Sequence, residues 1–258
     1  MTEGLGVLEA ARTRARARAE RLVRGWLRRR GLAIVAHSPD EYVHARRARV
    51  LAEHGVDVVL DVGANTGQYV GHLRQEGFRG RVVSLEPVRA TFERLRQAAA
   101  SDSRWDVRHA AAGEAAGTLE LHVYADSVHN SARAPSPGRP MPARIGSETA
   151  PVITLDSLSG DVWSAGDAIA LKIDVEGFEG EVLRGASSLL EHVRVVEVEL
   201  STVPLHEGQW LLPDVASYLY ARGFALTSLR PIWTDPGTGA LVLADGIFER
   251  RDASRAPG

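Results

Sequence analysis

Two acidic residues end strand-like apolar segments of the chain, and each is placed to contact a bound nucleotide. Asp61 lies in VVLDVGANTG (58–67), and Glu86 ends RVVSLE (81–86). Glycines let the backbone approach a ligand closely, and a helix that begins after such a turn presents free N–H groups. A carboxylate on the second strand accepts hydrogen bonds from the ribose hydroxyls, a charge-assisted contact worth roughly 1.5–3 kcal/mol. The pattern predicts a nucleotide pocket.

The glycine spacing separates two kinds of nucleotide. The turn from Gly63 to Gly67 lacks the G-x-G-x-x-G spacing on which a pyrophosphate lies in dinucleotide-binding folds. A carboxylate at Asp61 repels a pyrophosphate but attracts the ammonium group of an amino acid. The residues therefore favour S-adenosylmethionine and a methyltransferase, with a nicotinamide-dependent oxidoreductase as the alternative.

A second group of ionisable residues interrupts the apolar segment LKIDVEG (171–177). Lys172, Asp174 and Glu176 are spaced two apart, so on a strand they share one face. Burying three such groups is costly, so we expect them at the carboxyl end of the strand, where open α/β sheets bind ligands. Lys172 is the only lysine of the chain. A purely structural ion pair between Lys172 and a neighbouring carboxylate is compatible with catalysis.

Strand-like and helical segments alternate along the chain, which predicts a parallel sheet covered by helices on both faces. The turn TDPGTGA (234–240) predicts a tight hairpin, and hence one antiparallel strand near the sheet edge. The expected helices are 42–53, 66–76, 88–100, 178–190 and 211–220, and the expected strands are 58–62, 81–86, 105–111, 118–124, 168–174, 193–200, 224–230 and 240–249.

Residues 125–150 contain four prolines and almost no periodic apolar residues. Loops of this length are uncommon inside compact domains and often serve as lids over active sites. We therefore expect a long mobile lid loop, with simple disorder as the alternative.

Length and composition limit the remaining classes. At 258 residues the chain is long enough for one large α/β domain, here expected over 41–258. The absence of cysteine excludes disulfides and thiolate zinc sites, and no apolar run is long enough to span a bilayer. Without a signal-peptide pattern, we expect a cytoplasmic protein that does not insert stably into membranes.

Charge is distributed unevenly. The first thirty residues carry nine arginines against three glutamates, which leaves 22 basic and 30 acidic residues in the remainder. A basic arm over residues 1–40 on an acidic body suits self-association into a homodimer, or an anionic surface, better than nucleic-acid binding by the main domain. A solvated helix without such a role is the alternative.

Several of these motifs occur together, and in this order the sequence resembles the FkbM family of S-adenosylmethionine-dependent O-methyltransferases. The similarity rests on LDVGANTGQY, SLEP, LKIDVEGFEGEVLRGA, VVEVELS, PLHEG and DPGTGALVLADGIFER, from about residue 56 onward. It implies a bacterial enzyme with a class I methyltransferase (Rossmann-like) fold: a seven-stranded, mostly parallel sheet with an antiparallel C-terminal hairpin. The implied acceptor is a hydroxyl of a saccharide or glycosylated metabolite. A polyketide or other secondary-metabolite scaffold, and a non-catalytic cofactor-binding module, are the alternatives.

The resemblance also implies roles for individual residues around the cofactor. Glu86 would hold the ribose with Pro87 beside it, and Ala110 and Ala111 would lie next to the adenine. Asp174 would lie near the amino-acid end of the cofactor and the acceptor hydroxyl. The residues implied around the methionine part are Asp61, Gly63, Asn65, Thr66, Gly67 and Tyr69.

Methyl transfer from a sulfonium is an in-line displacement, so alignment alone can supply up to roughly 7–11 kcal/mol. A general base adds about 10²–10⁴-fold, and the candidate bases are His129, His206, Asp174 and Glu176. For each histidine taken alone, a surface residue without a role is the favoured interpretation.

A divalent metal that acidifies the hydroxyl is the alternative to a base. Oxygen ligands favour Mg²⁺, and Asp174, Glu176 and Glu199 are the candidate ligands. Glu197 and Glu199 also alternate with valines, as on a strand with one wetter face.

Overall fold

The computed structural model describes residues 39–251, with the backbone alone for 39–43. The predicted basic arm (1–40), apart from its last two residues, lies outside the described residues, and so does the dimer contact expected from it. Residues 47–251 belong to one compact unit. Within residues 39–251, no helix has the length and apolarity needed to cross a membrane.

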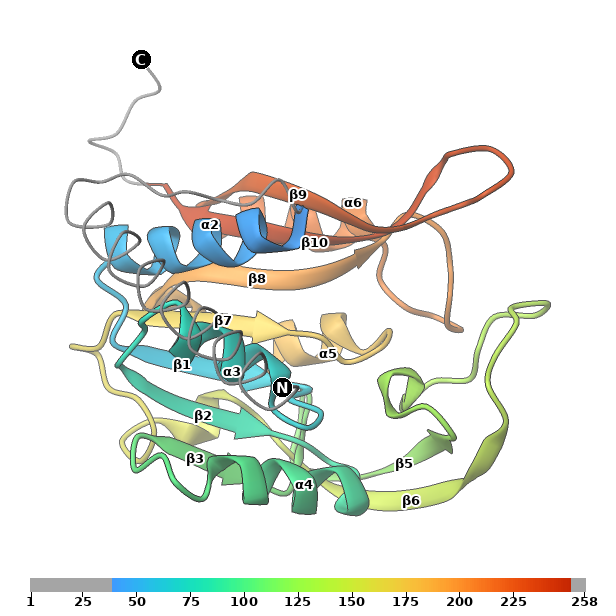
Figure 1. The fold of residues 1–258 in the computed structure, drawn as a ribbon, viewed down its shortest axis with the longest axis horizontal. Helices are drawn as coiled ribbons and strands as arrows, with labels where there is room; N and C mark the ends of the chain where they lie inside the picture. Colours follow the sequence, from blue (N-terminus) through green and yellow to red (C-terminus); the bar gives the residue numbers. More distant parts are fainter. Residues whose placement is uncertain (1–38, 252–258) are drawn as a thin grey trace, which may run out of the picture. The chain divides into compact units, whose positions relative to one another are not determined.

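A seven-stranded sheet forms the centre of this unit, in the order β3-β2-β1-β7-β8-β10-β9 (Figure 1). The first five strands in this order are parallel, β10 is antiparallel to β8, and β9 is antiparallel to β10. This confirms the predicted mostly parallel sheet with an antiparallel C-terminal hairpin. The strands are β1 (Val58–Val62), β2 (Arg81–Leu85), β3 (Trp105–Arg108), β7 (Ile169–Ile173), β8 (Val193–Ser201), β9 (Phe224–Thr234) and β10 (Leu241–Arg250).

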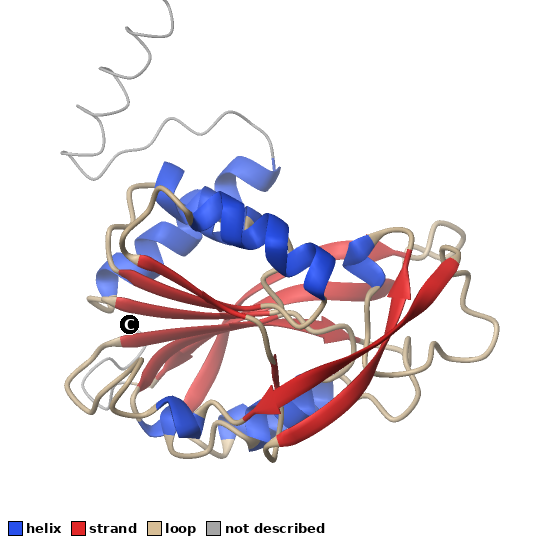
Figure 2. Cartoon of the chain, turned by 90° about the horizontal axis from the view of Figure 1, so that it is seen from below, coloured by secondary structure: helices blue, strands red, loops and turns tan. Residues whose placement is uncertain are grey.

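Helices cover both faces of the sheet (Figure 2). On one face, Leu60 and Leu171 pack with α5 and α6 through residues such as Leu183. On the other face, Val59 packs with α3 and with Val50 of α2. The helices are α2 (Pro39–Glu53), α3 (Gln68–Gln75), α4 (Arg89–Ala99), α5 (Glu179–Arg184) and α6 (Leu212–Tyr220).

A second, three-stranded sheet differs from expectation. It has the order β4-β6-β5, from β4 (Ala111–Ala112), β5 (Gly117–Tyr124) and β6 (Arg144–Ile153). The predicted loop over 125–150 is therefore wrong in its second part, because residues 144–150 pair antiparallel with β5. The predicted strand 105–111 is likewise divided between β3 and β4 of different sheets.

The predicted helix 178–190 is also interrupted, into α5 and a 3-10 turn at Leu189–Glu191. The interruption falls at Gly185, where an added Cβ would lie 1.9 Å from the carbonyl oxygen of Gly113. Close contact between these two backbones therefore ends α5 early.

Candidate active site

A cavity of about 300 Å³ lies where the parallel strands end, at the edge on which the two predicted acidic sites meet. This volume is at the lower end of the roughly 300–1,000 Å³ range of ligand pockets. The loop after β5 and the β9–β10 hairpin contribute the outer walls. Its walls include most of the predicted site residues: Gly63, Asn65, Glu86, Pro87, Ala110, Ala111, Asp174, Glu176 and Glu199.

The glycine turn after β1 is shaped by left-handed backbone at Gly63 (φ 76°), Asn65 (φ 49°) and Gly67 (φ 93°). A Cβ added to Gly67 would lie 2.6 Å from the Trp105 ring, so only glycine fits there. The amide of Gly63 donates to the carbonyl of Leu85 (3.1 Å), which fixes the turn to the end of β2.

Glu86 follows β2 and is almost fully buried beside this turn. Its carboxylate accepts the N–H of Asn65 (3.0 Å) through one oxygen and the N–H of Val88 (2.9 Å) through the other. Burial raises the pKa of Glu86 to about 7, against the lowering effect of these two hydrogen bonds. Each oxygen keeps a further lone pair, which is what a pair of ribose hydroxyls requires.

Asp61 does not line the cavity. Its side chain is fully buried, accepts a hydrogen bond from Ser84 Oγ (2.8 Å) and lies 3.5 Å from the Lys172 ammonium. Asp61 is the second-last residue of β1 and shares the face of Val59, inside the sheet. The predicted contact of Asp61 with the methionine part therefore has no support in the cavity lining, and Lys172 links Asp61 to the residues that do face the cavity.

Three further residues that were expected near the methionine part, Thr66, Gly67 and Tyr69, do not line the cavity. Thr66 and Gly67 are absent from the lining, although Gly67 shapes the turn. Tyr69 donates through its hydroxyl to Glu197 (3.1 Å) on β8.

The turn after β7 presents Asp174 and Glu176 to the cavity. Glu176 has a left-handed backbone (φ 52°). Behind this turn, buried Glu179 accepts the N–H groups of Gly177 (3.0 Å) and Val175 (3.4 Å). Burial, followed by the negative charge of Asp174, raises the pKa of Glu176 to about 8.

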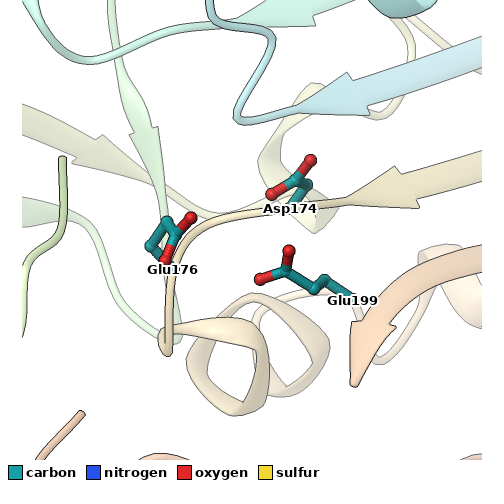
Figure 3. A group of neighbouring side chains, drawn as sticks. All are labelled: Asp174, Glu176 and Glu199. Atoms are coloured by element: carbon teal, nitrogen blue, oxygen red, sulfur yellow. The ribbon is translucent and has the colours of Figure 1, made fainter. Parts of the chain in front are cut away.

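Glu199 completes an acidic cluster with the other two predicted metal-ligand residues. Asp174, Glu176 and Glu199 each offer a carboxylate oxygen within 4.8 Å of the others (Figure 3). Burial and the charges of Asp174 and Glu176 raise the pKa of Glu199 well above its usual range. Three such oxygens fit a hard divalent cation or, without one, a shared proton. Glu197 is not on a wetter face: it is buried and paired with Arg47.

The two candidate histidines lie off the cavity. His206 is 1% exposed, packs against Gly177 and lies 3.1 Å from the Arg139 guanidinium through Nε2. Burial and neighbouring Arg139 lower the pKa of His206 to about 4, so it is neutral. His206 is therefore not a surface residue, as one alternative expected, but it supports the turn that carries Glu176. His129 is partly exposed and does not line the cavity, although its neighbours do.

Sequence reasoning missed the loop and hairpin residues that close the site. Ser127 donates to the side-chain oxygen of Asn65 (3.1 Å), and Ser131 donates to the Glu176 carbonyl (2.6 Å). These bonds fasten the loop after β5 to the glycine turn after β1 and to the turn after β7, whereas its motion as a lid stays a prediction. On the hairpin, Arg230 of β9 donates to Asp245 of β10 (2.5 Å). Opposite charges on two strands joined by a tight turn are the sequence feature that could have predicted this pair.

The order of the large sheet, with a glycine turn after β1 and an acidic residue after β2, defines a class I methyltransferase fold. The chain belongs to the FkbM methyltransferase family, since the sequence profile of the methyltransferase FkbM domain matches residues 61–226.

Two known proteins are similar to this chain, one in sequence and one in fold. "Methyltransferase 1" of Beauveria bassiana (strain ARSEF 2860) is 24% identical over 194 residues, which cover 69% of this chain and 76% of that protein. The crystal structure of a putative methyltransferase from Thermobifida fusca YX has the same fold, with a TM-score of 0.50, 14% identity, and coverage of 83% of this chain and 81% of that one.

Proposed function

We propose that this methyltransferase transfers the methyl group of S-adenosylmethionine to a hydroxyl of a saccharide or glycosylated metabolite. One observation carries the proposal: the glycine turn with Glu86, and the acidic group of Asp174, Glu176 and Glu199, face a single cavity. The first set matches a nucleoside, and the second matches a positively charged sulfonium next to a hydroxyl that loses its proton.

The residues present fit the cofactor. Glu86 offers acceptor lone pairs for the ribose, while Ala110 and Ala111 give a small apolar wall on which an adenine can lie. Asp174 keeps 43% of its side chain exposed, so its charge remains available to an ammonium group. When bound, S-adenosylmethionine supplies an electrophilic methyl group.

The chain's own contribution is alignment and proton acceptance. The bonds from Ser131 and Glu179 hold the turn that carries Glu176, so its carboxylate faces the acceptor region in a fixed position. Of the four candidate bases, the structure brings Asp174 and Glu176 into the cavity and leaves both histidines out. Glu176, when ionised, is a stronger base than a carboxylate of ordinary pKa because its pKa is raised to about 8, and we assign it proton acceptance.

The acceptor side is rich in hydrogen-bonding groups, as a polyhydroxylated substrate requires. Ser127, Asn130, Arg230 and Asp245 line it together with the acidic cluster. A second candidate acceptor, a polyketide-like scaffold, is favoured by the apolar side chains of Val128 (48% exposed) and Ile232 (45% exposed), which line the same cavity.

Calorimetry followed by an acceptor assay tests the proposal. We expect S-adenosylhomocysteine to bind and NAD not to bind; the reverse result indicates an oxidoreductase. Radiolabelled methyl transfer to a panel of saccharides, glycosides and aglycones then identifies the acceptor class. Cofactor binding without a product from any acceptor would indicate a non-catalytic binding module.

Metal dependence is tested in the same assay. If Asp174, Glu176 and Glu199 hold Mg²⁺ as predicted, a chelator abolishes methyl transfer and added Mg²⁺ restores it. If the chelator does not change the activity, the three carboxylates do not hold a required metal ion and act only as acid–base groups.

A further inference from the structure

A row of polar side chains crosses the large sheet next to the cavity. Ser84, Asp61, Lys172 and Glu197 occupy laterally paired positions on four neighbouring parallel strands, β2, β1, β7 and β8. Paired positions on parallel strands share one face, so the four side chains lie side by side. Their residues are at most 9% exposed, and the positions on either side of them are apolar. Such a row is costly in a sheet core unless every member is partnered.

Partners close both ends of the row. Trp105 donates its indole N–H to Ser84 (2.9 Å), which in turn donates to Asp61. At the other end Arg47 donates to Glu197 through Nε (2.6 Å) and through a second guanidinium nitrogen.

Charge alternates along the row: Asp61 is negative, Lys172 positive, Glu197 negative and Arg47 positive. The row and its partner Arg47 are therefore neutral together. Asp174 follows Lys172 by two residues and so lies on the same face, where it adds one negative charge to this group; its side chain is 43% exposed. The surplus charge of the network is thus presented to the cavity.

Lys172 is the member that joins this row to the site. Its ammonium lies 3.1 Å from the carbonyl oxygen of Gly63, 3.3 Å from Asp174 and 3.5 Å from Asp61. The ammonium donates a hydrogen bond to the Gly63 carbonyl and forms ion pairs with the Asp174 and Asp61 carboxylates. These acceptors belong to the glycine turn, the turn after β7 and strand β1, which are the parts that must keep their relative positions for in-line transfer.

The residue type fits this task. Every other basic side chain of the chain, histidine aside, is arginine, yet here the sequence has its single lysine. A planar guanidinium with a fixed donor fork cannot point to three acceptors on different sides, whereas a compact ammonium can. Burial lowers the pKa of Lys172, but Asp174 and Asp61 more than reverse this, so the side chain is charged.

We propose that Lys172 is a positioning residue for methyl transfer: it holds the Asp174 carboxylate against the glycine turn, so that both face the cofactor together. This inference rests on the proposed function for its catalytic consequence. A purely structural Lys172 would stabilise the fold without affecting what Asp174 does.

A double-mutant cycle separates the two roles. Lys172→Met should weaken S-adenosylhomocysteine binding by about tenfold or more in the wild-type background but by no more than about twofold when Asp174→Asn is already present, because directly linked residues are non-additive. Arg47→Met is the matched control, since it removes the other buried cation of the same row. It should lower Tm comparably and leave the affinity unchanged.

Two results overturn the inference. One is an additive effect of Lys172→Met and Asp174→Asn on affinity. The other is a loss of affinity in Arg47→Met as large as that in Lys172→Met. If Lys172→Met does not fold, Lys172→Arg replaces it: charge is retained but the three-way contact is lost, so a tenfold loss of affinity that depends on Asp174 is still expected.

A spectroscopic test does not depend on the cofactor. Lysine-selective ¹³C labelling gives one Cε signal, because the chain has one lysine. Asp174→Asn should shift this signal, whereas Glu176→Gln, an adjacent cavity carboxylate, should leave it in place. An unmoved signal in Asp174→Asn refutes the inference. If the wild type binds no S-adenosylhomocysteine, the proposed function fails, and the Lys172–Asp174 link is judged by this signal alone.

Discussion

The α-carbon of Gly63 faces the backbone of Asp174 so closely that an added Cβ would lie 1.8 Å from the Asp174 carbonyl oxygen. Gly63 belongs to the turn after β1, and Asp174 belongs to the turn after β7, which are 111 positions apart (174 minus 63). The cofactor side and the acceptor side of the cavity are therefore in backbone contact, and the size of residue 63 sets the distance between them.

Substitution of Gly63 tests this contact. Gly63→Ala must separate the two turns and also adopt a left-handed φ of 76°, a backbone strain of about 1–3 kcal/mol before the clash is counted. We expect S-adenosylhomocysteine binding to be lost and Tm to fall. Gly71→Ala is the control, since an added Cβ there meets nothing within 4 Å. Binding that is equally strong in both variants would contradict the described contact.

Glu86 predicts a pH dependence of cofactor binding. Its pKa is about 7, and the ionised form is the better acceptor for ribose hydroxyls. Affinity for S-adenosylhomocysteine should rise as the pH increases through 7 and then level off. Glu86→Gln should remove this dependence and cost about 1.5–3 kcal/mol, roughly ten- to hundredfold in Kd. Calorimetry from pH 5.5 to pH 8.5, about 1.5 units on either side of this pKa, measures both.

The same carboxyl group affects stability with the opposite sign. Its pKa is raised on folding from 4.5 to about 7, so folding favours the protonated form. The contribution of Glu86 to stability is complete below pH 4.5 and is lost as the pH rises through 7. Denaturant unfolding of the wild type and Glu86→Gln over this range should show a difference that grows with pH. A constant difference would contradict the raised pKa.

Buried Glu179 predicts a local stability effect. Glu179→Ala leaves the N–H of Gly177 without its acceptor, which costs about 1–3 kcal/mol, and Glu179→Gln, which keeps an acceptor oxygen, should cost less. Glu120→Ala is the surface control, because that side chain is 63% exposed and its removal should change stability by less than about 0.5 kcal/mol. Urea unfolding of the three variants provides the measurement, and equal losses in Glu179→Ala and Glu120→Ala would contradict the role of Glu179.

The large sheet was predictable because its strands are short apolar runs separated by glycine turns and helical spacing. Strand β6 was missed because residues 144–150 are mostly exposed and polar, and their pairing with β5 is a tertiary contact without a local pattern. The break after α5 has the same kind of origin, in the approach of Gly185 to Gly113.

The site was predictable in its residue types more than in its contacts. The sequence identified Glu86, Asp174 and Glu199, which line the cavity. It could not tell that the Asp61 side chain is buried on one face of the sheet and away from the cavity. All residues of β1 are buried, so the sequence pattern does not distinguish its two faces. His206 was a candidate on residue type alone, and its burial behind Gly177 depends on the packing of two distant segments.

The central claim is that one cavity holds S-adenosylmethionine, with its ribose at Glu86 and its amino-acid part beside the two touching turns of Gly63 and Asp174. A crystal structure of the protein grown with S-adenosylhomocysteine tests it most directly. The account predicts both ribose hydroxyls within hydrogen-bond distance of the Glu86 carboxylate and the sulfur facing the cluster of Asp174, Glu176 and Glu199. A nucleoside bound elsewhere on the chain, or an empty cavity at saturating ligand, would contradict it.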